Sequence, residues 1–166
     1  MFGFLKNKKS EESKEFSLVS PIQGRAFPLS EVADPVFSQK MAGDGVAIDP
    51  TGDIVVAPAD GELTLVFKTK HAFALTLTNG AEILVHIGID TVSLKGEGFE
   101  QLATEGTNVK AGTPIIKIDR QFIKSKGFSL VTPVLITNTD DFGSVSPVEN
   151  IDTIPGETIV INYTAK

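Results

Sequence analysis

The sequence predicts an all-β protein, an antiparallel β-sandwich or barrel with one or two short helices. Three observations support this class. The chain of 166 residues breaks into short apolar runs, separated by many of its 15 Gly and 9 Pro. Almost no run shows the longer period of an amphipathic helix. Hydrophobic residues make up 41% of the chain and charged residues 22%, so a globular domain with its own core is expected.

The apolar runs define the expected strands: FSLVSPIQGRAFPL from residue 16, GDGVAIDPTGDIVVAP from 43, GELTLVFKTKHAFALTL from 61, AEILVHIGI from 81 and TPIIKI from 113. SPIQGRAFPL and APADGELTLV share a P-x-x-G element before an apolar run, which indicates a duplicated β unit. Two helices of about two turns each are expected, in EGFEQLA near Phe99 and in DRQFIKSKG near Phe122, with Gly127 ending the second.

Residues 1–15 are expected to form a polar, flexible leader, and residues 16–166 a single domain. The leader's apolar stretch is too short for a secretory signal, and its lysines follow that stretch. No apolar run approaches the roughly 20 residues that span a bilayer. We therefore expect a cytoplasmic protein. A peripheral contact of the leader with the inner face of the membrane stays open as an alternative.

Charge and composition exclude several classes of function. A net charge of -6 and a pI near 4.9 argue against nucleic acid as a partner and favour basic proteins. The absence of cysteine excludes disulfides, a Cys-ligated zinc site and a thiol nucleophile. No H-E-x-x-H motif and no serine triad signature is present, so a hydrolase has little support.

The only two histidines, His71 and His86, lie on either side of Asn79-Gly80. This dipeptide predicts a two-residue type I′ turn, which places Phe73 opposite His86. Residues opposite each other, or two apart on a strand, share a face, so this register puts both imidazoles on one face. A one-residue slip would separate them. Gly88, opposite His71 in this register, is expected to leave open space beside that ring.

Three interpretations of the histidine pair are open. A neutral imidazole is a nucleophile near physiological pH, and a second imidazole can stabilise negative charge on a transferred group, which suits phosphoryl transfer. Alternatively, the pair binds zinc with a third ligand, for which Asp44 and Asp90 are candidates. The third interpretation is that both rings fill hydrogen-bonded core positions.

Beside the pair, VFSQKMAGDG places apolar residues in a stretch rich in loop formers. One interpretation is a docking rim for a basic partner, with Asp34, Asp44 and Asp90 supplying charge. The other is a flap that folds back onto the core. The apolar side chains concerned are Val36, Phe37, Met41 and Ala42.

Four segments resemble one family: DPVFSQKMAGDGVAIDPTG from residue 34, VVAPADGELTLVFKTKHAF from 55, EILVHIGIDTVSLKGEGFE from 82 and EGTNVKAGTPIIKID from 105. They cover nearly the whole chain after the leader. The family is the glucose-type enzyme IIA component of the bacterial PEP-dependent sugar phosphotransferase system. The resemblance implies an antiparallel β-sandwich of the duplicated hybrid type, a phosphotransferase component, and no required cofactor.

The resemblance also implies roles for residues. His86 matches the phosphorylated histidine, His71 the histidine that stabilises the phosphoryl group, and Thr69 a threonine that supports the site. The phosphocarrier protein HPr would phosphorylate His86, which would pass the group to a cysteine of a IIB domain of a sugar permease. We expect the Nδ1–H of His86 to be held by a backbone carbonyl, that of Gly88. Zinc at His71 and His86, completed by a partner carboxylate, stays an alternative.

The resemblance further implies a partner surface and a second function. The function is that of a regulatory module that clamps transporters or metabolic enzymes according to its phosphorylation state. Lys70 and Leu84 depart from some family members, and the sugar stays open. The residues that match the partner surface are Asp34, Val36, Phe37, Met41, Ala42, Phe67, Leu84, Asp90 and Val92.

The segment EGTNVKAGTPIIKI also resembles the strand pattern of lipoyl and biotinyl carriers. Those carriers need a lysine at a hairpin tip for modification. The predicted tip here is Asn79-Gly80, so we set this class aside.

Overall fold

A computed structural model describes residues 14–166 of the chain. Of the leader predicted for residues 1–15, residues 1–13 lie outside the described part. The first strand begins at Glu15. Within residues 14–166, no helix is long and apolar enough to cross a membrane.

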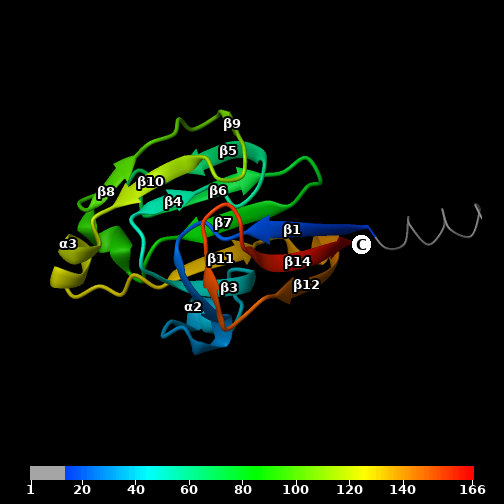
Figure 1. Ribbon diagram of the computed structural model, residues 1–166, viewed down its shortest axis with the longest axis horizontal. Helices are drawn as coiled ribbons and strands as arrows, with labels where there is room; N and C mark the ends of the chain where they lie inside the picture. Colours follow the sequence, from blue (N-terminus) through cyan, green and yellow to red (C-terminus); the bar gives the residue numbers. More distant parts are fainter. Residues whose placement is uncertain (1–13) are drawn as a thin grey trace, which may run out of the picture.

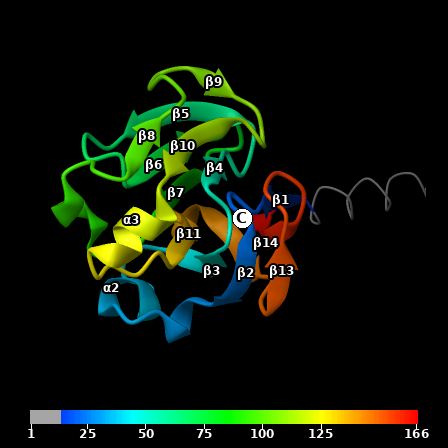
Figure 2. The same cartoon turned by 60° about the vertical axis from the view of Figure 1, so that its left-hand side comes forward.

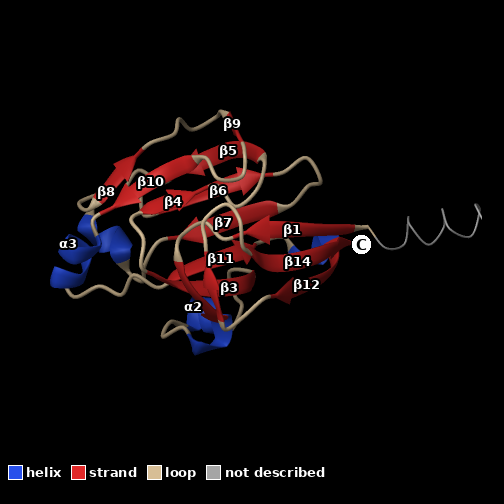
Figure 3. Ribbon diagram, in the orientation of Figure 1, coloured by secondary structure: helices blue, strands red, loops and turns tan. Residues whose placement is uncertain are grey.

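The all-β class is confirmed (Figures 1 and 3). In the described part of the chain, antiparallel strands form one sheet of eight strands and two sheets of three. The large sheet has the order β13-β2-β3-β11-β7-β6-β5-β9, and the small sheets have the orders β1-β14-β12 and β4-β10-β8. The strands are β1 (Glu15–Val19), β2 (Gly24–Pro28), β3 (Asp44–Pro50), β4 (Ile54–Val56), β5 (Gly61–Val66), β6 (Ala72–Thr76), β7 (Glu82–His86), β8 (Phe99–Gln101), β9 (Asn108–Val109), β10 (Pro114–Ile118), β11 (Thr132–Ile136), β12 (Phe142–Pro147), β13 (Ile151–Thr153) and β14 (Ile159–Ala165).

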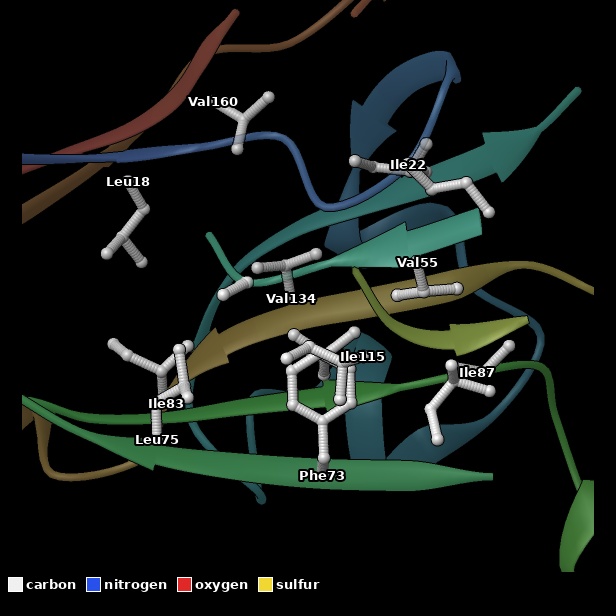
Figure 4. Packing of buried hydrophobic residues seen from close by; sticks show 14 of the residues in the cluster. Leu18, Ile22, Val55, Phe73, Leu75, Ile83, Ile87, Ile115, Val134 and Val160 are labelled. Atoms are coloured by element: carbon white, nitrogen blue, oxygen red, sulfur yellow. The ribbon is translucent and has the colours of Figure 1, made fainter. Parts of the chain in front are cut away.

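The helical segments are short and lie at the periphery (Figure 2). The α-helices are α2 (Pro35–Ser38) and α3 (Arg120–Ser125), and the 3₁₀ turns are η1 (Leu29–Glu31), η2 (Thr91–Leu94) and η3 (Thr139–Asp141). The core lies between the large sheet and the two small ones. Figure 4 shows part of this core, where side chains of β6, β7 and β11 meet those of β1, β4, β10 and β14.

One of the two predicted helices is present. In α3 the Asp119 side chain caps the N-terminus by accepting the Phe122 N–H at 3.1 Å. Gly127 ends the helix at φ +88°, where the Phe128 N–H bonds back to the Ile123 carbonyl. Gly127 therefore acts as the predicted stop.

The helix expected near Phe99 is wrong, because Phe99–Gln101 forms strand β8 against β10. Two glycines at positive φ, Gly96 and Gly98, precede it, and such residues break a helix and favour turns. Within the strand Phe99 is buried against the core, while Glu100 and Gln101 are exposed.

The predicted register of the β6–β7 hairpin is wrong by one residue. Ala72 lies opposite His86, and Phe73 lies opposite Val85. The turn contains the three residues 78–80, and of these Gly80 alone has a positive φ. The core decides the register, because this pairing puts the large buried side chains of the two strands on one face, whereas the two-residue turn would have split them. These side chains are Phe73, Leu75, Ile83 and Val85.

The duplicated β unit predicted from the P-x-x-G elements is present as a structural repeat. In each copy the Gly is the first residue of a strand, β2 or β5. The Val19 N–H donates to the Pro58 carbonyl at 2.9 Å, and the Val56 N–H donates to the Pro21 carbonyl at 2.7 Å. Val19 and Val56 hold equivalent places in the two copies, as do Pro21 and Pro58. The two copies are thus joined by a reciprocal pair of hydrogen bonds.

A second, smaller apolar cluster lies on the outer face of the large sheet. Here η1 and α2 cover β3 and β11, below the sheet in Figure 1. The segment 29–42 therefore forms a flap over the outer face, next to the end of β7 that carries His86. The buried members of this cluster are Leu29, Val32, Phe37, Ala47 and Leu135.

Candidate functional site

The two histidines lie in contact, as predicted, but for a different reason. Their ring centroids are 4.9 Å apart and the ring planes are nearly perpendicular, at 84°. His86 is the last residue of β7, whereas His71 lies in the loop before β6, directly after Lys70 at φ +59°. Strand alternation therefore does not set the direction of the His71 side chain, and the slipped register does not separate the rings.

His86 is held by the backbone of the loop that follows it. Its Nδ1 lies 2.7 Å from the Gly88 carbonyl oxygen. A carbonyl accepts hydrogen bonds and cannot donate them, so Nδ1 carries the proton in the neutral ring and Nε2 keeps a free lone pair. The predicted role of the Gly88 carbonyl is confirmed. The Phe37 ring packs on the imidazole with a centroid distance of 5.0 Å.

His71 has a different partner, which allows it the opposite tautomer. Its Nδ1 lies 2.7 Å from the Thr69 hydroxyl oxygen. When the hydroxyl donates to Nδ1, the Nε2 of His71 carries the proton and can donate it toward a group on His86. The Phe67 ring meets the imidazole edge-on at 5.3 Å, and the His71 side chain is buried.

Burial keeps both imidazoles neutral at neutral pH. It lowers the pKa of His71 to about 4, and repulsion by the neighbouring His86 contributes. Burial also lowers the pKa of His86, while the Gly88 hydrogen bond and the negative charges of Asp34 and Asp90 partly oppose the shift. A nucleophilic lone pair is thus available at His86 without prior deprotonation.

The loop after His86 is packed, so the open space predicted beside Gly88 is wrong. A Cβ added to Gly88, which has φ +83°, would lie 2.5 Å from Thr91 Cγ2 and 2.8 Å from the Ser129 carbonyl oxygen. Thr91 is buried and donates its hydroxyl to the Ile87 carbonyl at 2.6 Å. Ser129 also accepts the Ile89 N–H. Neither Thr91 nor Ser129 was among the predicted site residues. The position of Thr91 directly after the H-I-G-I-D run could have pointed to it, whereas no motif marks Ser129.

The predicted partner residues differ in their exposure. Three are well exposed: Val36 at 44%, Met41 at 70% and Val92 at 51%. Phe37 is buried in the second apolar cluster, as the flap interpretation expects, whereas Val36 and Met41 have the exposure that a docking rim would need. The partly buried members of the set are Asp34, Ala42, Phe67 and Leu84.

The acidic residues near the pair have separate environments. Asp34 caps α2 by accepting the Val36 N–H at 2.9 Å. Asp90 is exposed, at φ +60°, at the start of η2. Asp44, a candidate zinc ligand, instead accepts the Gly45 N–H and pairs with Lys40 at 3.6 Å. In the part of the chain that the structure describes, no three His, Asp or Glu side chains are grouped to hold a metal. The two imidazoles would need a ligand from outside.

The fold and the site define the class as a β-sandwich protein with two neutral, facing imidazoles at the edge of an apolar surface. Residues 16–142 match the family model of the phosphoenolpyruvate-dependent sugar phosphotransferase system, EIIA 1. The chain belongs to this family, and its resemblance to the glucose-type enzyme IIA is confirmed.

Curated relatives agree with the family. The chain is 45% identical over 166 residues to a glucose-specific EIIA component from Bacillus anthracis, covering 100% of this chain and 98% of that protein. It is 47% identical over 150 residues to an N-acetylglucosamine-specific EIICBA component from Klebsiella pneumoniae, covering 90% of this chain and 23% of that protein. The solved glucose permease IIA from Mycoplasma capricolum superposes with a TM-score of 0.82 at 36% identity, over 90% of this chain and 96% of that one.

Proposed function

We propose that this chain is a phosphohistidine carrier, in which Nε2 of His86 accepts a phosphoryl group from phospho-HPr and passes it to a cysteine of a IIB domain. Membership of the EIIA family supports a phosphocarrier role in sugar uptake. The observation that carries the assignment to His86 is the 2.7 Å contact between its Nδ1 and the Gly88 carbonyl. This contact leaves Nε2 as the free nucleophile of a neutral ring.

The transfer needs two displacements at phosphorus. The lone pair of His86 Nε2 forms the new N–P bond, while the bond between phosphorus and the donor atom breaks and the donor atom keeps the bonding pair. In the second step the IIB thiolate attacks phosphorus, and the electron pair returns to Nε2. His71, with the proton on its own Nε2, would donate a hydrogen bond to the phosphoryl oxygens in both steps. Positioning and charge stabilisation would supply the rate.

The surface around the pair suits the proposed partners. Val36, Met41 and Val92 provide exposed apolar contact area, and Asp34 and Asp90 place negative charge beside it. A net charge of -6 would speed the encounter with a basic donor such as HPr. Because HPr must reach the site, we expect the protein to act in the cytoplasm.

The deciding experiment maps the phosphorylated residue. Incubation with radiolabelled phospho-HPr should add one acid-labile phosphoryl group per chain, and His86→Ala should abolish the labelling. Labelling of the His86→Ala protein would overturn the assignment. Transfer of the label from the wild-type protein to a panel of purified IIB domains would then identify the permease.

A second proposed function, regulatory docking, is favoured by the apolar residues that border His86. A phosphoryl group adds a charge of about -1.5 to -2, which opposes burial of that surface under an apolar partner. Binding to a regulated transporter or metabolic enzyme should therefore differ between the two states, and equal capture by both would refute a switch. Zinc held by His71, His86 and a partner carboxylate belongs to this proposal; metal analysis of such a complex would test it.

A further inference from the structure

Strand β5, which leads into the His71 loop, contains a β-bulge. Leu63 lies opposite Leu75, but Leu65 lies opposite Ala74, so one extra residue stands on β5 between them. That residue is Thr64, whose hydroxyl donates to the Ala74 carbonyl at 3.3 Å. A bulge of this kind changes the face on which the following side chains lie.

The bulge turns Leu65 outward. Leu63 and Val66 are both buried, at 0% and 7% exposure, and face the core. In a regular strand Leu65 would share the face of Leu63. Instead Leu65 is 43% exposed and lies on the outer face, where its neighbour across the ladder is Ala74. An apolar side chain is thus exposed at a position that regular pairing would bury.

The Glu105 carboxylate supports the bulge from the edge of the sheet. Before the bulge, the backbone of Leu63 pairs with that of Gly106 and Thr107, at 2.7 and 2.8 Å. Beyond it the Val66 N–H donates to Glu105 Oε2 at 2.8 Å. The side chain takes over where backbone pairing stops, and a carboxylate acceptor makes this hydrogen bond a strong one.

This support is close to the site along the chain. The residue after Val66 is Phe67, whose N–H donates to the Ala72 carbonyl at 3.0 Å and whose ring meets His71. The loop that carries Thr69 and His71 therefore begins one residue after the Glu105 contact.

Leu65 also extends the apolar surface beside the histidines. Leu65 pairs with Ala74, Ala74 pairs with Leu84, and Leu84 pairs with Leu135 beneath the flap. Leu65, Ala74 and Leu84 thus form a row across the outer face, which runs from β5 toward the flap. Two exposed acidic residues, Glu62 and Glu82, share this outer face through their pairing with Thr76.

We propose that Leu65 is a partner-contact residue of the docking surface, and that Glu105 is the positioning residue that holds it there through the Val66 N–H. The occupant is the phosphoryl donor, a protein that presents apolar side chains within a basic surface, since the row is apolar and its border acidic. This inference rests on the proposed function.

Leu65→Ser tests the contact, with Leu102→Ser as the matched control. Leu102 is exposed to the same degree, 44%, and follows β8 in a different sheet. Leu65→Ser should raise the KM for phospho-HPr about tenfold and change kcat less than about twofold, because it removes a docking contact and no reacting group. Leu102→Ser should keep the wild-type KM. Equal KM values for the two variants would overturn the role of Leu65.

Two variants of Glu105 separate positioning from direct charge contact. Glu105→Ala should raise the KM for phospho-HPr about as much as Leu65→Ser does, whereas Glu105→Gln, which keeps an acceptor oxygen, should restore it to within about twofold of wild type. If Glu105→Gln is as impaired as Glu105→Ala, the carboxylate acts through its charge and the positioning role is refuted.

A spectroscopic measurement on the unphosphorylated protein needs no partner. In Glu105→Ala the Val66 amide hydrogen should exchange with solvent about tenfold faster than in wild type, because its acceptor at 2.8 Å is gone. Glu105→Gln, which keeps an acceptor oxygen, should stay near the wild-type exchange rate, and equal exchange in wild type and Glu105→Ala would overturn the contact. Failure of wild-type His86 to become phosphorylated would instead refute the proposed function, and the amide measurement would still decide the role of Glu105.

Discussion

The imidazole rings of His71 and His86 meet nearly at right angles, with 4.9 Å between their centroids. Each ring is tied through Nδ1 to a different kind of partner, a hydroxyl for His71 and a carbonyl for His86. Both contacts use Nδ1, so Nε2 of His71 can donate a hydrogen bond and Nε2 of His86 can accept one. The pair is therefore asymmetric, and the two residues should respond differently to substitution.

His71→Ala should still accept a phosphoryl group on His86 but pass it on slowly. Loss of one positioned hydrogen-bond donor to a charged transition state costs about 10² to 10³ in rate. Rapid-quench measurement of transfer to a IIB domain checks this. His71→Gln keeps a donor and should recover part of the rate, and normal transfer by His71→Ala would refute its role.

Thr69→Val should slow transfer by about tenfold, because the methyl that replaces the hydroxyl cannot donate to Nδ1 of His71 and the tautomer is no longer fixed. Thr69→Ser keeps the hydroxyl and serves as the control. The same transfer assay compares the two proteins. Equal rates for Thr69→Val and wild type would show that the 2.7 Å contact has no part in transfer.

Stability should fall on mild acidification because of His71. Its pKa is lowered to about 4 from 6.5, so the unfolded chain binds a proton first. The stability that the neutral ring contributes is fully present above about pH 6.5 and is lost as the pH falls toward about 4. Relative to about pH 8, His71 should cost about 2 kcal/mol at about pH 5. Urea unfolding of wild type and His71→Gln should diverge in this way, and parallel curves would contradict the assignment.

Gly88→Ala should destabilise the fold and impair phosphorylation together. The added Cβ would meet the Ser129 carbonyl oxygen at 2.8 Å at a backbone φ of +83°. Strain and overpacking of this kind cost about 2 to 4 kcal/mol. Gly80→Ala is the matched control, since Gly80 has φ +90° but nothing within 4 Å of an added Cβ. It should cost about 1 kcal/mol from backbone strain alone. Urea unfolding compares them, and equal losses would show that packing against Ser129 is unimportant.

Much of the fold could be predicted from local pattern. The P-x-x-G elements predicted a repeated unit, because Pro and Gly set the backbone where each copy enters its strand. Asp119 and Gly127 bounded α3 through capping that depends on a few neighbouring residues. The segment near Phe99 was misread because two short turns have almost no periodicity, so pairing with β10 decided its state.

The site was predicted in part. The Gly88 carbonyl could be predicted as the partner of His86 because the two residues are only two positions apart in the chain, within reach of an imidazole. The hairpin register does not follow from Asn79-Gly80. In the folded protein, Asn79 donates its side-chain amide to the Tyr163 hydroxyl at 2.8 Å, a partner 84 residues away.

The sequence by itself determined the β class, the repeat, the family and the identity of the two histidines, because these depend on residue types and spacings along the chain. Tertiary structure alone decided how the histidines meet, through the left-handed Lys70 and the core that chose the register. It also decided that Leu65 faces outward, since Glu105 reaches Val66 from 39 positions away. Contacts between residues so far apart in the chain form only when the sheets pack, so no local sequence pattern predicts them.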